Sequence, residues 1–155
     1  CGHVELDGSQ ESRLRKLIQA GQAGSPEYAE IKAGMEDFRA RNIRPHLEAV
    51  TWSLRELLEY AGRTGIRLGL ENRYHYFDIP SQEEMDILLG LADAERLGFI
   101  FDSGHARAMS LLGFFDEEMW LNRYSRRIIG THLQDTNGVN DHYAPGLGEI
   151  DFGMI

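Results

Sequence analysis

The chain has 155 residues, 42% of them hydrophobic, and a formal net charge of −9. This composition supports one compact core in a single domain and excludes a disordered chain. No apolar run approaches the roughly 18 residues of a membrane span, no signal peptide is visible, and the negative charge opposes binding to nucleic acid. The single cysteine, Cys1, excludes an intramolecular disulfide framework. We therefore expect a soluble cytoplasmic protein with neither a membrane nor a nucleic acid as partner.

The first third of the chain is predicted to be mainly helical. A strand is expected to end at Val4 to Leu6, and Ser9 to Ala20 carries apolar residues at helical spacing. Ser25-Pro26 combines a capping serine with a proline at the first helical position, so a second helix should begin there. Pro45 indicates a further helix start, and that helix should end at one of the two following glycines, Gly62 or Gly65.

In the rest of the chain, predicted strands and helices alternate. Short apolar stretches bounded by turn residues predict three strands, at Ile66–Leu70, Leu97–Phe101 and Ile128–Leu133. Helices are predicted between them, from the capping box Ser81 to Glu84, from about His105 to Leu112 and from Asp116 to Tyr124. This order indicates βα units on a parallel sheet. After Gln134 the chain is turn-rich until Ile150-Asp151-Phe152, where the next helix is expected to begin.

A possible metal ligand lies at the end of each of the three predicted strands. Glu71, Asp102 and His132 succeed one another at intervals of 31 and 30 residues. Side chains at the carboxyl ends of parallel strands face one common rim, where α/β enzymes place their chemistry. A complete barrel of eight such units needs roughly 250 residues. We therefore expect residues 1–155 to form a single partial (β/α)8 barrel of about four units, as a fragment of a longer chain.

Two carboxylates and one imidazole at one rim form a mixed oxygen and nitrogen site suited to Mn²⁺, Mg²⁺, Co²⁺ or Zn²⁺. Each residue also has a simpler explanation. Asp102 is equally explained as a helix cap, His132 as a hydrogen-bonded core residue, and Glu71 as the ion-pair partner of Arg73 or Arg67. The matched intervals favour the joint site. His105, three residues after Asp102, is a candidate for binding a second metal or a substrate hydroxyl.

Two further polar segments allow two interpretations each. The loop Tyr74 to Phe77, which contains His75, is suited either to covering a substrate or to packing. The segment His132 to Phe152 is either a polar surface loop or the rim of a site. Its Pro145 to Gly148 turn allows close backbone approach, because glycine adopts conformations that other residues avoid. His46 is expected on a solvated helix face.

The motifs around these strand ends resemble those of the xylose isomerase-like TIM barrels. The resemblance lies in LEN at residues 70–72, FDSGHA at 101–106, HLQDTNG at 132–138 and DHYAPGLGEIDF at 141–152. It covers about Ile66 to Phe152. This superfamily contains sugar and sugar-phosphate isomerases and epimerases, together with the endonuclease IV type of apurinic endonuclease.

The resemblance implies one divalent metal ion held by a Glu, an Asp, a His and a second Glu from successive strand ends. The first three match Glu71, Asp102 and His132, and the second Glu would lie beyond the end of this chain. His105, His142 and Arg73 are implied to contact the substrate or a second metal. The endonucleases usually read Asp-x-His in this loop, whereas this chain has Asn140-Asp141-His142. That departure weakens a zinc-ligand role for Asp141.

The implied function is that of a metal-dependent sugar or sugar-phosphate isomerase or epimerase. The metal would stabilise an enediolate, and Glu71 is the candidate base that moves a proton next to the carbonyl. The alternatives are a metal-dependent apurinic endonuclease and a non-catalytic relative that binds metal or ligand. A partial barrel exposes sheet edges, so we expect association with a second copy or with the missing barrel half. The expected small-molecule partner is a sugar.

Overall fold

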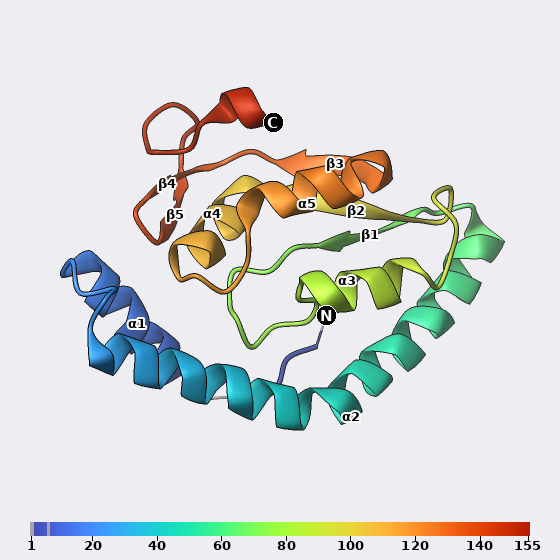
Figure 1. The fold of residues 1–155 in the computed structure, drawn as a ribbon. Coiled ribbons are helices and arrows are strands. Elements are labelled where there is room, and N and C mark those ends of the chain that lie inside the picture. Colours follow the sequence, from blue (N-terminus) through green and yellow to red (C-terminus); the bar gives the residue numbers. More distant parts are fainter. Residues whose placement is uncertain (1, 6) are drawn as a thin grey trace.

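The core of the molecule is a parallel sheet of three strands. The computed structural model describes residues 2–5 and 7–155, without the side chain of residue 154. The strands are β1 (Leu68–Glu71), β2 (Leu97–Asp102) and β3 (Ile128–His132), and they lie in that order. Figure 1 shows α3, α5 and the long helix α2 arranged around this sheet. Parallel strands linked by helices confirm the predicted βα units and the partial barrel.

Side chains alternate between the two faces of β2. Leu97, Phe99 and Phe101 are fully buried in a cluster with residues of the helices. On the opposite face, glycines leave room for isoleucines. A Cβ at Gly98 would lie 2.3 Å from Ile129 Cγ2. Because the strand period is two residues, Asp102 shares this second face. The alternation therefore directs Asp102 away from the helices and toward the interior face of the partial barrel.

Helix α1 (Gly8–Gln19) forms where it was predicted, and α2 (Pro26–Thr64) is one continuous helix of 39 residues. The predicted second start at Pro45 is wrong, because Pro45 lies inside α2. Proline removes one backbone donor and bends a helix, and α2 is visibly curved in Figure 1. The N–H of Gly65, which has a left-handed φ of 70°, donates to the Ala61 carbonyl and ends the helix.

Two hydrophobic clusters fill the molecule. The first, here called the sheet cluster, joins β2 to α2, α3 and α5. Its fully buried members include Phe99, Phe101, Met85, Leu88 and Trp120. The second, here called the rim cluster, joins α1 and α2 to the segments beyond the sheet. It is made of Leu14, Leu17, Tyr28, Met35, Met109, Leu112 and Val139.

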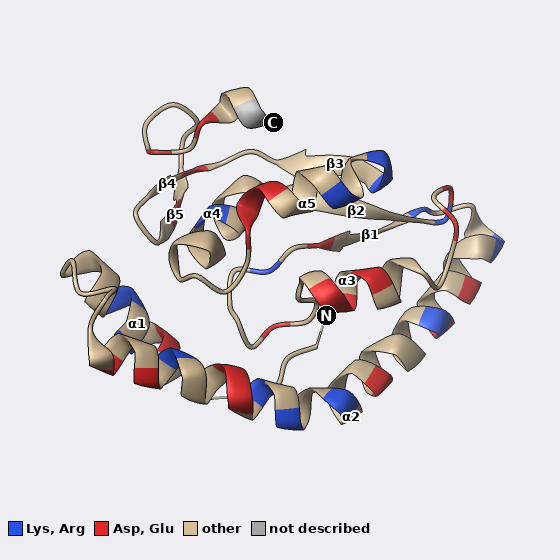
Figure 2. Ribbon diagram, viewed as in Figure 1, with Lys and Arg blue, Asp and Glu red and all other residues tan. Residues whose placement is uncertain are grey.

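The solvent side of α2 carries alternating charges. Figure 2 shows Lys and Arg interspersed with Asp and Glu along this helix. Pairs four residues apart join Asp37 to Arg41, Arg44 to Glu48 and Glu59 to Arg63. Exposed pairs of this kind contribute little to stability. Among the described residues, no helix is long and apolar enough to cross a membrane.

A buried ion pair fastens α2 to α3 (Gln82–Leu89). The Arg39 guanidinium contacts both carboxylate oxygens of Glu84, and the two side chains are 6% and 7% exposed. Arg39 also donates to the backbone carbonyls of Tyr76 and Asp78. Glu84 completes the predicted capping box with Ser81. The loop between β1 and α3 is therefore held to α2 by a network in which the charged groups are paired.

The N-terminal segment packs against the loop that follows β1, and its Val4 side chain is buried. Of the predicted strand end Val4 to Leu6, residue 6 lies outside the described residues, as does Cys1. The described part forms a single antiparallel bridge between His3 and Asp78, and Val4 N–H donates to the Phe77 carbonyl at 2.8 Å. These contacts attach the segment to the loop that follows β1.

The second half of the chain largely follows the prediction, with one correction. Helix α4 (Ser103–Leu111) begins directly after β2, and α5 (Glu117–Tyr124) and the 3-10 turn η1 (Ser125–Arg127) lead to β3. The segment after Gln134 is not entirely loop. It contains the antiparallel hairpin β4 (Asp135–Asn137) and β5 (Asn140–Tyr143), and the chain ends in the short 3-10 turn η2 (Phe152–Met154).

Candidate metal centre at the strand ends

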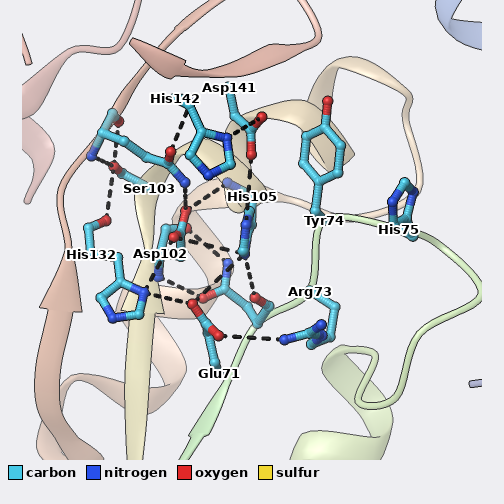
Figure 3. A network of polar contacts seen from close by, with 12 residues as sticks. Glu71, Arg73, Tyr74, His75, Asp102, Ser103, His105, His132, Asp141 and His142 are labelled. Atoms are coloured by element: carbon cyan, nitrogen blue, oxygen red, sulfur yellow. Dashed lines mark hydrogen bonds and ion pairs between the residues drawn. The ribbon is translucent and has the colours of Figure 1, made fainter. Parts of the chain in front are cut away.

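The last residues of the three parallel strands converge on one point. Glu71, Asp102 and His132 each offer a ligand atom, and these atoms all lie within 4.8 Å of one another. His132 Nδ1 lies 2.7 Å from Glu71 Oε1 and 3.5 Å from Asp102 Oδ2 (Figure 3). Strand pairing places Asp102 directly beside His132. The structure thus brings together the three residues that the sequence predicted as ligands.

Asn72 fixes the spacing between β1 and β2 at this rim. Its side chain is fully buried and pairs with the backbone of Asp102. The Asn72 amide nitrogen donates to the Asp102 carbonyl at 2.9 Å, and its oxygen accepts from the Asp102 N–H at 2.8 Å. This pair copies a strand hydrogen-bond pair just beyond the end of β1. The role of Asn72 is not visible in the sequence, because the pairing depends on a residue 30 positions away.

The two oxygens of Asp102 have different surroundings. Oδ1 accepts from the backbone N–H of His105 at 2.9 Å and from the side-chain amide of Gln134 at 2.7 Å. Oδ2 faces His132. Asp102 is therefore the N-cap of α4 through one oxygen, while its other oxygen remains directed at the candidate metal position. The cap and the ligand are compatible roles.

Glu71 divides its carboxylate in a similar way. Oε1 faces His132, whereas Oε2 lies 3.4 Å from the Arg73 guanidinium. Arg73 Nε also lies 3.4 Å from Asp78 Oδ2. The ion pair between Glu71 and Arg73 is thus present without removing Glu71 from the cluster. Arg73 borders the candidate metal position but offers it no ligand atom.

His105 stands beside the cluster, between it and the hairpin. Its Nδ1 lies 3.0 Å from the carbonyl of Asn72, and because a carbonyl only accepts, Nδ1 carries the proton. Its Nε2 lies 3.6 Å from Asp141 Oδ2 (Figure 3). Asp141 is 10% exposed, and its Oδ2 has no hydrogen-bond partner among the described residues. His142 Nδ1 contacts Asp141 Oδ1 at 2.8 Å, and its ring is 79% exposed.

The aromatic loop Tyr74 to Phe77, which follows β1, is anchored by helix α1. Glu11, 2% exposed, accepts from Arg15, His75 and the Tyr76 N–H. Burial raises the pKa of Glu11. The hydrogen bonds and the Arg15 charge together lower this pKa by more than burial raises it, so the pKa of Glu11 lies below its ordinary value. His75 stacks on Phe77 and therefore serves packing.

Tyr74 is the member of this loop that reaches the rim. Its ring lies 5.6 Å from that of His105, and the Arg15 guanidinium lies 4.0 Å above the Tyr74 ring. Arg15 also donates to the carbonyls of Tyr74 and Val139, so α1 connects the loop to the hairpin turn. The sequence did carry a signal for this role of α1, because Glu11 and Arg15 lie four residues apart on the helix and next to the apolar Leu14.

The turn Pro145 to Gly148 is organised by one buried carboxylate. Asp135, 1% exposed, accepts from the backbone N–H groups of four residues, namely Thr136, Gly146, Gly148 and Ile150. A Cβ at Gly148 would lie 2.1 Å from the Thr136 carbonyl oxygen. The close backbone approach expected of this turn is therefore made to Asp135 and Thr136. Burial raises the pKa of Asp135, but the four donors outweigh it and lower the pKa to about 2.

This lowered pKa predicts an acid-sensitive loop. The folded-state pKa of Asp135 lies below the ordinary value of about 3.9. Its stabilising contribution is therefore complete above that value and is lost as pH falls toward and through about 2. Asp135→Asn should be less stable than the unaltered protein at pH 6, and the difference should shrink between pH 4 and about 2. Urea denaturation of both proteins across this pH range measures it, and a constant difference would contradict the assignment.

Comparisons with known proteins identify the family to which the chain is similar. The family model described as "Xylose isomerase-like TIM barrel" matches residues 22–155. The uncharacterized protein MJ1311 of Methanocaldococcus jannaschii is 34% identical over 104 residues, which is 64% of this chain and 34% of that protein. The rhizopine catabolism protein MocC of Rhizobium meliloti is 32% identical over 117 residues, 72% of this chain and 34% of MocC.

A third relative has a named enzymatic activity. The inosose dehydratase of Geobacillus kaustophilus is 34% identical over 86 residues, which is 54% of this chain and 27% of that enzyme. The chain thus spans about a third of the length of the first two relatives and less of the third.

Proposed function

This chain belongs to the xylose isomerase-like TIM barrel family, and on that basis we propose that it is part of a carbohydrate-modifying enzyme that holds one divalent metal ion through Glu71, Asp102 and His132. The observation that carries the proposal is the convergence of the three ligand atoms within 4.8 Å at the ends of consecutive parallel strands. In α/β enzymes the chemistry lies at this end of the sheet.

The donor set fits a divalent ion. Two carboxylates and one imidazole suit Mn²⁺, Mg²⁺, Co²⁺ or Zn²⁺. Asp102 and Glu71 each have one oxygen engaged elsewhere and one directed at the cluster. A bound ion would supply positive charge that stabilises negative charge developing on a substrate oxygen.

The proposed reaction is proton transfer next to the carbonyl of a polyhydroxy substrate, as in a sugar isomerase or epimerase. Glu71 is the candidate base, since its Oε2 points away from His132 and toward Arg73. Arg73 borders the same carboxylate and orients it. His105 and Tyr74 line the adjacent rim, where a polyhydroxy substrate would find both a ring nitrogen and an aromatic face.

Dehydration is the second candidate reaction, favoured by the inosose dehydratase among the relatives. Removal of a proton next to a carbonyl begins both reactions. In an isomerase or epimerase the proton returns to carbon, whereas in a dehydratase the hydroxyl on the neighbouring carbon leaves with a proton as water. The same Glu71 therefore serves either outcome.

Turnover in D₂O distinguishes these reactions. The full-length protein, loaded with Mn²⁺, is incubated with aldoses, ketoses and inosose, and the products are followed by mass spectrometry. A product that carries deuterium on carbon and has lost no water supports isomerisation or epimerisation. A product that has lost one water supports dehydration. Bound metal without turnover of any sugar or inosose would support the non-catalytic relative. Three bound zinc ions with incision of abasic DNA would support the endonuclease instead.

We also propose that the open sheet associates with a further protein surface. β1 and β3 are the two edges of the three-stranded sheet among the described residues. Unpaired edges and exposed apolar side chains such as Ile66 and Leu133 favour association. Size-exclusion chromatography of residues 1–155 should show a dimer or larger species. A monomer at all concentrations would contradict this expectation.

A further inference from the structure

The side chain of Gln134 bridges the candidate metal centre and the β4–β5 hairpin. Its Nε2 donates to Asp102 Oδ1 at 2.7 Å, and its Oε1 accepts from the backbone N–H of His142 at 2.9 Å. A carboxylate oxygen only accepts and a backbone N–H only donates, so the two partners fix which way the amide points. Both ends of Gln134 are therefore engaged, one at a ligand of the metal centre and one on the hairpin.

The start of α4 is shaped to hold Gln134 in this position. Ser103 Oγ donates to the Gln134 carbonyl at 2.6 Å and accepts from the Gln134 backbone nitrogen at 3.0 Å. The hydroxyl therefore holds both backbone polar groups of Gln134. At Gly104, a Cβ would lie 2.8 Å from Gln134 Cγ. A side chain at this position would displace Gln134. The residues on both sides of the bridge thus restrict it to one geometry.

On the hairpin side, the bridge ends at a residue with an unusual backbone. His142 has a φ of 67°, the left-handed conformation that residues other than glycine rarely adopt. Its N–H is held by Gln134. The preceding residue, Asp141, is thereby placed with Oδ2 3.6 Å from His105 Nε2 (Figure 3). Val139 and Arg15 anchor the turn of the hairpin, and the contact that begins at Asp102 holds its second strand at His142.

From this arrangement we propose that Gln134 is a positioning residue that couples metal binding at Glu71, Asp102 and His132 to ordering of the β4–β5 hairpin. The inference rests on the proposed metal centre. Together with the His105 N–H, Gln134 holds Oδ1 and so fixes the rotation of the Asp102 carboxylate with Oδ2 toward His132. A supporting contact of this kind strengthens a metal site. Coupling between two sites is reciprocal, so metal binding must in turn favour the docked hairpin.

The coupling has a consequence for substrate binding. With the hairpin docked as in this structure, His105 Nε2 lies 3.6 Å from Asp141 Oδ2. A protein without metal would therefore present a loosened rim, and metal binding would complete the surface that meets the hydroxyl groups of a polyhydroxy substrate. Because the coupling is reciprocal, metal binding and substrate binding would favour each other through Gln134.

The test compares Gln134→Met with the unaltered full-length protein. Methionine keeps the length of the side chain but offers neither amide group. Affinity for Mn²⁺ is measured by calorimetry, and amide hydrogen exchange of residues 135–143 is measured with and without Mn²⁺. The control is Asn140→Ala, which removes a hydrogen bond within the hairpin to the Asn137 carbonyl and does not touch Gln134 or Asp102.

We expect Gln134→Met to weaken Mn²⁺ binding by roughly 10- to 100-fold and to abolish the slowing of hairpin exchange on Mn²⁺ addition. Asn140→Ala should retain both properties. Gly104→Ala, which displaces the Gln134 side chain without removing its amide, should shift both measurements in the same direction as Gln134→Met. Folding of each variant is checked by circular dichroism.

Two results would overturn the coupling, and they differ in what else they affect. If Gln134→Met binds Mn²⁺ as tightly as the unaltered protein, or keeps the Mn²⁺-dependent slowing of exchange, the coupling is absent while the metal centre stands. If the unaltered protein binds no divalent ion, the metal centre itself is wrong and the coupling fails with it.

Discussion

Replacing His132 with alanine is expected to weaken divalent-metal binding by more than the roughly 10- to 100-fold that loss of a supporting residue costs. His132 supplies the imidazole of the candidate centre, and its removal leaves two carboxylates close together. The side chain is 58% exposed. Its loss therefore opens no cavity in the core, and the thermal unfolding temperature of the metal-free protein should change little.

The matched control for this substitution is His46→Ala. His46 lies on α2, within the described residues but outside the group of possible ligands. Titration of both variants with Mn²⁺ by calorimetry separates loss of a ligand from loss of any histidine. If His132→Ala and His46→Ala bind Mn²⁺ with equal affinity, His132 is not a ligand.

Replacing Arg39 with methionine is expected to lower the free energy of unfolding by about 3–5 kcal/mol, the usual cost of leaving one member of a buried ion pair without its partner. Glu84 is 7% exposed and would keep an unpaired carboxylate. The carbonyls of Tyr76 and Asp78 would also lose their donors. Urea denaturation at neutral pH measures the change.

Two variants separate the buried pair from a general effect of losing an arginine. Arg44→Met removes a member of an exposed pair with Glu48 and should leave the free energy of unfolding unchanged. The double variant Arg39→Met/Glu84→Gln leaves no unpaired carboxylate and should recover part of the stability lost by Arg39→Met alone. A double variant no more stable than Arg39→Met would contradict the ion-pair explanation.

The three converging strand ends could be predicted because they depend on local patterns. A short apolar run predicts a strand, and parallel strands bring their last residues to one rim. Glu71, Asp102 and His132 needed no knowledge of side-chain packing. The helix cap at Asp102 was also visible locally, but the sequence did not show that its two oxygens allow the cap and a ligand role together.

The hairpin was missed although it carries a recognisable signal. Gly138 and Val139 form the two-residue connection between β4 and β5, glycine is common at the first position of such a turn, and Gly138 adopts a φ of 55°. The flanking residues are polar and lack the apolar alternation expected of strands. Pro45 was misread for the opposite reason. Local rules place a proline at a helix start, whereas in α2 apolar contacts on both sides of Pro45 keep the helix continuous.

Asn72 and Gln134 could not be assigned from the sequence. Each makes its decisive contact with Asp102, which lies 30 and 32 positions away along the chain. A buried polar side chain needs a partner, but which partner it finds is decided by how the strands and helices pack. Local propensity carries no information about such pairs.

The single long helix α2 has a consequence for how the molecule unfolds. Tyr28 and Met35 near its start belong to the rim cluster, whereas Leu54 and Leu58 near its end belong to the sheet cluster. Because one helix belongs to both clusters, the two clusters should unfold together. Heating should therefore give one cooperative transition, and hydrogen exchange should report the same opening free energy for the cores on both sides of Arg39. Through α2 the rim cluster thus shares the stability of the sheet cluster.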